Sequence, residues 1–133
     1  MKSNKIKVVT YLRVSSNNEK DIRDKELEMS KLVSKYENDW EIVAQFEDIG
    51  CNGRKLERVA LSNLFDKLDC VDMVVTLSPK MIARDVLVYK DIYQKIESKK
   101  CALYIRDVHR ENIPKKKFSS LDLPTTNVAY SFA

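Results

Sequence analysis

The chain has 133 residues, 44% hydrophobic and 33% charged, a composition that predicts one globular domain and excludes a disordered chain. Its net charge of +4 permits binding to nucleic acid but is below that of most dedicated DNA-reading modules. No apolar stretch approaches the roughly 18 residues that span a bilayer, and no signal peptide precedes the first apolar segment, so we expect a cytoplasmic protein without a membrane partner.

The first apolar segment, Ile6–Leu12, predicts a strand. Arg13 and Ser15 follow it, and a polar stretch begins at Asn17. A strand end before a polar loop can hold a serine hydroxyl beside a cation. Serine at such a place more often serves as a loop or cap residue, so this pattern alone decides neither interpretation.

Mixed charge with apolar residues at helical spacing predicts an exposed amphipathic helix over residues 21–36. A second strand is expected at Trp40–Glu47, and Asp48 follows it. Gly50 and Gly53, the only two glycines of the chain, come next. Glycine serves where the backbone takes a positive φ or approaches another group closely, although an ordinary turn would also account for the pair.

The second half of the chain continues the alternation. Helical spacing predicts a helix at Ala60–Leu68. Val71–Leu77 is a nearly unbroken apolar run, typical of a strand buried on both faces. After Ser78–Arg84, a helix is expected at Asp85–Ser98 and a fourth strand at Cys101–Ile105.

Strands that alternate with helices predict an α/β fold with a mostly parallel sheet of four or five strands flanked by helices. Ligands of such sheets bind at the carboxyl ends of the strands. Arg13 and Ser15, the two-glycine loop and Ser78–Arg84 each follow one of the first three strands. We therefore expect these segments to converge on one edge and form a shared site.

The cysteines and the single histidine argue against a metal centre. Cys51, Cys70 and Cys101 are odd in number and far apart, which suits reduced thiols better than disulfides. His109 is the only histidine, and no Cys-x-x-Cys spacing occurs. We expect no metal and no cofactor, so phosphoryl chemistry would have to rely on arginine and lysine.

The motifs together resemble the catalytic domain of the serine recombinases, the resolvase/invertase and large serine integrase family. The family pattern is Tyr-x-Arg-Val-Ser, Asp-x-Gly-x-Ser-Gly, Arg-Pro and Asp-Arg-x-x-Arg. The chain has Tyr-Leu-Arg-Val-Ser at residues 11–15 and Asp-Ile-Gly-Cys-Asn-Gly at residues 48–53, and the resemblance runs from about Ile6 to about Arg106. It implies a resolvase-like fold and site-specific DNA recombination through a 5′-phosphoserine intermediate.

The resemblance also implies roles for individual residues. Ser15 would be the nucleophile, and Arg13, Arg58 and Arg84 match the family's active-site arginines. The supporting residues would be Asp48, Lys80 and Asp85. Weak DNA contacts are expected from Lys115, Lys116 and Lys117, although a lysine run is most often a solvated loop.

The chain departs from the family pattern at several positions. Asp-Arg-x-x-Arg becomes Lys80-Met81-x-x-Arg84, so the first arginine of the pair is missing. Asn52 replaces the serine of the glycine motif, and Val59 replaces the proline after Arg58. Losing one phosphate-clamping donor typically costs on the order of 10²-fold in rate. The resemblance therefore supports the fold better than it supports the activity.

We expect residues 1–107 to form the catalytic domain and 108–133 an irregular tail, where the family's long dimerisation helix would start, and we expect the family's DNA-binding region to be absent. The expected partners are DNA and, in the full-length protein, further copies in a homodimer or tetramer, with no small-molecule substrate. Two alternatives stay open. One is a catalytically decayed member of the same fold that binds DNA or dimerises. The other is a small-molecule-binding α/β domain unrelated to DNA.

Overall fold

A computed structural model of the chain describes residues 5–50 and 59–109. Two of the sequence predictions, the roles of Arg58 and of Lys115–Lys117, lie outside the described residues, as does the assignment of the tail beyond residue 109. The strands are β1 (Ile6–Val14), β2 (Trp40–Ile49), β3 (Met73–Thr76) and β4 (Ala102–Ile105). The helices are α1 (Glu19–Lys35), α2 (Val59–Lys67), the 3₁₀ turn η1 (Leu68–Cys70), α3 (Pro79–Ile82) and α4 (Val86–Ser98).

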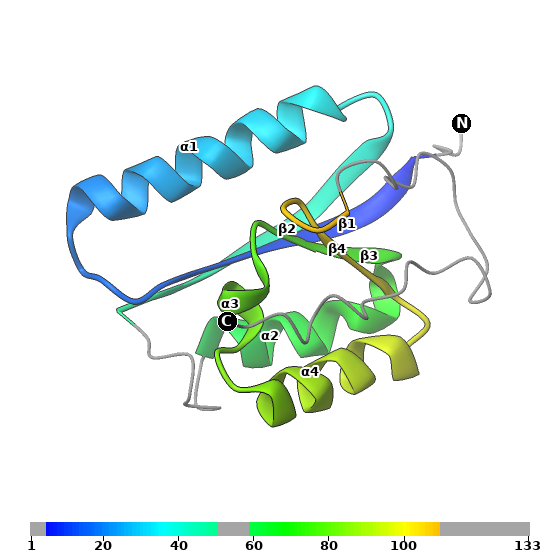
Figure 1. The fold of residues 1–133 in the computed structure, drawn as a ribbon. Helices are drawn as coiled ribbons and strands as arrows, with labels where there is room; N and C mark the ends of the chain where they lie inside the picture. The colour runs from blue at the N-terminus through cyan, green and yellow to red at the C-terminus, as the bar shows by residue number, and fades with distance from the viewer. Residues whose placement is uncertain (1–4, 51–58, 110–133) are drawn as a thin grey trace.

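The four strands form one parallel sheet in the order β2-β1-β3-β4. The predicted α/β fold with a parallel sheet of four or five strands is therefore confirmed. Residues that alternate along a strand face opposite sides of the sheet, and two hydrophobic clusters result. Val9, Tyr11 and Leu103 pack with α2 and α4. Val8 and Tyr104 pack with α1. Figure 1 shows α1 on one side of the sheet and α2 and α4 on the other.

Two local differences from the sequence prediction concern the site. β1 continues to Val14, so Arg13 lies inside the strand instead of following it. Ser78–Arg84, expected only as a connection, contains the short helix α3, with Pro79 at its first position. Proline suits a first helical position because its missing N–H has no helical partner there. No helix in residues 5–50 and 59–109 has the length and apolarity needed to cross a bilayer.

Candidate active site

The carboxyl ends of β1 and β2 lie side by side and bring the first two motifs together. In the register of the two strands, the backbone of Arg13 lies opposite that of Asp48. The Gly50 N–H donates to the Val14 carbonyl oxygen at 2.6 Å. Gly50 has φ +71°, and a Cβ there would lie 2.4 Å from Asn17 Oδ1. Only glycine fits this position without strain. The start of the two-glycine loop therefore lies against the loop that carries Ser15.

Ser15 is exposed at the end of β1 and shares a cavity of about 390 Å³ with Arg13. Arg13 itself is only 5% exposed, and its Nη2 donates to the backbone carbonyl of Lys80 in α3. This contact joins the end of β1 to the helix that follows β3. A buried guanidinium fixed in this way is oriented before a phosphate arrives.

The opposite wall of the cavity comes from α1, which the sequence prediction did not include in the site. Asp21, Asp24, Lys25 and Glu28 line it. Their spacing of three, four and seven residues places them on one helical face, and this spacing was the available signal. The cavity is therefore lined by both cationic and anionic side chains. The three carboxylates on its α1 wall disfavour a phosphate unless cations outweigh them.

Asp48 is buried and acts as a connector between elements. Its Oδ2 accepts from the Tyr11 hydroxyl at 2.7 Å and from the Leu61 N–H at 3.0 Å. Its Oδ1 accepts from the Ala60 N–H at 2.9 Å. The carboxyl thus satisfies donors in the first turn of α2, which have no partner within a helix. These contacts fix α2 and β1 against β2.

The residues around α3 take different places. Lys80 and Arg84 are exposed, and neither lines the Ser15 cavity. Asp85 caps α4, since its Oδ1 accepts from the Leu87 and Val88 N–H groups in the first turn at 2.7 and 3.2 Å. Met81 is 5% exposed and belongs to the cluster under α1, with its sulfur 3.4 Å from Thr76 Oγ1. The position that lacks the family arginine is therefore filled by a core side chain.

In residues 5–50 and 59–109, no group of three or more histidine, cysteine, aspartate or glutamate side chains is placed to hold a metal ion.

Comparison with known proteins gives a family match over most of the chain. The model of the resolvase N-terminal domain family matches residues 8–121. No curated protein sequence shows significant similarity.

Solved structures show the same fold. The C-terminal catalytic domain of ISC1926 TnpA, an IS607-like serine recombinase, aligns with a TM-score of 0.66 and 20% identity, covering 75% of this chain and 70% of that one. The N-terminal catalytic domain of TP901-1 integrase gives 0.65 and 23%, covering 76% and 78%. A resolvase family site-specific recombinase from Streptococcus pneumoniae gives 0.64 and 24%, covering 77% and 74%.

Proposed function

The chain belongs to the resolvase family, as a serine recombinase catalytic domain of site-specific recombination, and we propose that Ser15 is its nucleophile. The observation that carries the proposal is the cavity in which the exposed Ser15 lies beside the buried, anchored Arg13. Family membership removes the interpretation of a small-molecule-binding domain unrelated to DNA.

In the proposed step, Ser15 Oγ loses its proton and attacks the phosphorus of a DNA phosphodiester. A bond forms between Oγ and phosphorus, the bond to the 3′ oxygen breaks, and that oxygen leaves with a proton. The product is a 5′-phosphoserine link and a free 3′ hydroxyl. Attack of a 3′ hydroxyl from another strand reverses the step, so rejoining needs no ATP.

Arginines would stabilise the charge that develops on the phosphoryl oxygens. We propose this role for Arg13, which is already held beside Ser15, and for Arg84 and Arg58 by their match to the family motif. Lys80 would assist through its carbonyl contact with Arg13. Asp48 and Asp85 would act indirectly, since their carboxyls hold α2 and α4.

The partner is DNA, as the family implies, and we propose contact mainly through phosphates, with Lys115, Lys116 and Lys117 as weak additional contacts. Assembly as a homodimer or tetramer and a cytoplasmic location also belong to the proposal, with residues 1–107 as the catalytic unit and 108–133 as a tail. No metal or cofactor takes part in the proposed step.

A second candidate function is a non-catalytic module of the same fold that binds DNA or dimerises. The observations that favour it are the core position of Met81 and the carboxyls of Asp21, Asp24 and Glu28 around Ser15. Carboxylates repel a phosphate unless cations outweigh them.

A covalent-adduct assay separates the two functions. The full chain is incubated with a library of random-sequence duplexes, and protein linked to DNA is isolated under denaturing conditions and digested for mass spectrometry. We expect a nucleotide remnant on Ser15, which Ser15→Ala abolishes. Ser16→Ala is the matched control, because Ser16 is the neighbouring serine and its Oγ accepts from the Asn18 N–H at 2.9 Å. Absence of any Ser15-linked nucleotide would favour the non-catalytic module.

A further inference from the structure

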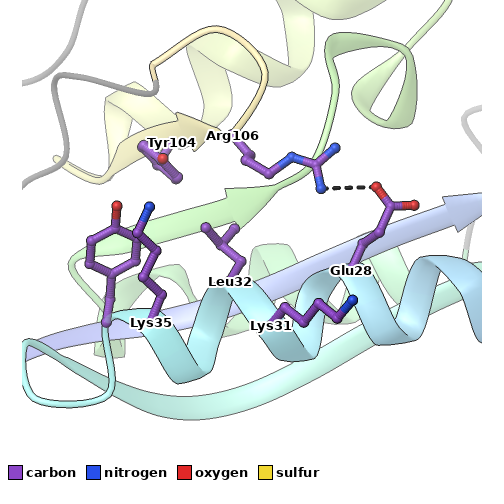
Figure 2. A pocket seen from close by; sticks show the side chains of 7 residues that line it. Glu28, Lys31, Leu32, Lys35, Tyr104 and Arg106 are labelled. Atoms are coloured by element: carbon purple, nitrogen blue, oxygen red, sulfur yellow. Dashed lines mark hydrogen bonds and ion pairs between the residues drawn. The ribbon is translucent and has the colours of Figure 1, made fainter.

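Glu28 on α1 binds two cations at once. Its Oε1 lies 2.9 Å from Arg106 Nη1, and its Oε2 lies 3.3 Å from Lys25 Nζ. Figure 2 shows the Arg106 side chain extended towards Glu28 from the opposite wall of a second cavity, of about 350 Å³. Glu28 lines this cavity and also the cavity of Ser15. The Glu28 carboxylate therefore borders both the Arg106 guanidinium and the proposed nucleophile's cavity.

The position of Arg106 follows from the sheet. It comes directly after β4, and its N–H donates to the Thr76 carbonyl oxygen at 3.0 Å. The alternation of side chains places Ala102, Tyr104 and Arg106 on the α1 face, in agreement with the cluster that contains Ala102 and Tyr104. Arg106 thus stands at the carboxyl edge that also carries Ser15.

The same face holds the position at which the family arginine is missing. Met81 packs in one cluster with Tyr104, beneath α1. A guanidinium delivered by Arg106 would therefore reach the edge of the site from the side on which position 81 lies. We propose, on the basis of the function proposed above, that Arg106 contacts the DNA phosphate at Ser15 and that Glu28 holds its guanidinium in the free protein until the phosphate replaces the carboxylate.

The chemistry of the ion pair fits this exchange. Burial raises the pKa of Glu28, but the hydrogen bonds and charges of Arg106 and Lys25 together outweigh it and leave the pKa below its usual value. The group is a carboxylate at neutral pH, and its Oε1 accepts from the Arg106 guanidinium as a phosphate oxygen would. Arg106 is also held by Asp107, at 2.9 Å from its Nη2 and Nε. The guanidinium is therefore oriented before DNA arrives.

Salt dependence of DNA binding tests the contact without requiring cleavage. Fluorescence anisotropy of the full chain with a labelled duplex of arbitrary sequence is measured over a series of NaCl concentrations. Arg106→Gln should reduce the slope of log K against log salt by about 0.9, the loss of one phosphate contact. Glu28→Gln should tighten binding several-fold, because it removes the carboxylate that competes with the phosphate.

The matched controls are Lys95→Gln and Asp91→Asn, which make the same charge changes at an exposed ion pair of 3.6 Å on α4. That helix packs on the opposite face of the sheet. Equal slopes for Arg106→Gln and Lys95→Gln, or weaker binding by Glu28→Gln, would overturn the proposal. Arg106→Lys should keep most of the slope, and it serves if the glutamine variant does not fold.

The adduct assay then distinguishes this inference from the proposed function. If Ser15 forms an adduct, Arg106→Gln should lower its rate on the order of 10²-fold, and an unchanged rate would contradict the role of Arg106 alone. If no adduct forms in the parent protein, the nucleophile proposal fails, and the salt slope still decides whether Arg106 meets a phosphate.

Discussion

Asp48 shows how one side chain in a catalytic motif can carry structure. The carboxyl accepts from three donors that belong to two elements, the hydroxyl of Tyr11 on β1 and two N–H groups of α2. A buried donor that loses its acceptor costs about 1–3 kcal/mol, more than the same bond contributes when formed. These contacts give Asp48, the acidic residue of the glycine motif, a structural role in holding β1 and α2 together.

Asp48→Ala should lower the free energy of unfolding by about 3 kcal/mol, the sum of a lost helix cap and a buried hydroxyl without its acceptor. Tyr11→Phe removes the hydroxyl together with its need for an acceptor and should cost only about 1 kcal/mol. Urea denaturation followed by circular dichroism measures both. Equal losses for the two variants would mean that the contacts to α2 contribute nothing.

Met81→Arg should destabilise the protein by about 3 kcal/mol, because it places a charge in the cluster beneath α1. The family arginine therefore cannot simply be restored at this position to supply a phosphate donor. Met81→Leu conserves volume and polarity and should stay within about 1.5 kcal/mol of the parent. Thermal unfolding of the two variants decides, and an arginine variant as stable as the leucine variant would show that side chain 81 can leave the core.

At the scale of elements, the apolar spacing predicted all four strands and the three long helices within a few residues. The short helix α3 escaped because four residues are too few to display a helical period. Arg13 was expected after its strand because the apolar run ends at Leu12, whereas β1 stays paired with β2 through Arg13 and Val14. The contact of Arg13 with Lys80 joins residues 67 positions apart. The α1 wall and the Glu28–Arg106 pair, 78 residues apart, depend on tertiary packing that no local spacing contains.

The contact between α1 and β2 should depend on pH through Glu47. Glu47 is exposed at the rim of a cavity of about 230 Å³. Its partial burial, with the hydrogen bond and charge of Glu26, raises the pKa of Glu47 to about 7. Because the pKa is raised, the folded protein binds the Glu47 proton more tightly than the unfolded chain does. The stabilisation from this proton is complete below the unfolded pKa of about 4.5, and it is lost as the pH rises through about 7. Glu47→Gln should therefore raise the melting temperature at about pH 8 and change it little at about pH 4.

Glu41→Gln, an exposed glutamate of the same strand, is the control for this comparison. It removes the same charge away from Glu26. If its melting temperature follows the same pH dependence as that of Glu47→Gln, net charge explains the effect and the Glu26–Glu47 pair does not.

At the scale of the whole molecule, the parallel sheet is the shared wall of both hydrophobic clusters. Strands β3 and β4 are buried along their entire length, which agrees with the apolar run expected at Val71–Leu77 for a strand covered on both faces. The polar groups of the candidate site lie at the carboxyl edge of the sheet, so the two hydrophobic clusters on its faces can remain apolar. Stability should therefore be cooperative across the described elements, with the site residues contributing chiefly through their links between layers.

Cys101 offers a direct measure of that cooperativity. It lies in the cluster with α2 and α4, and its Sγ donates to the carbonyl oxygens of Leu68 and Val71 at 3.2 and 3.3 Å. Burial, with the nearby charges of Asp72 and Asp69, raises the pKa of its thiol to about 11, so little reactive thiolate exists at neutral pH. Cys70 is exposed.

Iodoacetamide should therefore alkylate Cys70 rapidly in the native protein and Cys101 only through global unfolding. Peptide mass spectrometry after timed quenching follows the two sites separately. In Asp48→Ala, the labelling rate of Cys101 should rise by on the order of 10²-fold, because about 3 kcal/mol of lost stability increases the unfolded population by that factor. The labelling rate of Cys70 should not change.

Two outcomes would contradict this prediction: labelling of Cys101 in the parent as fast as that of Cys70, or the same labelling rate of Cys101 in Asp48→Ala and in the parent. Either would show that β4 and α4 open independently of the contacts around Asp48.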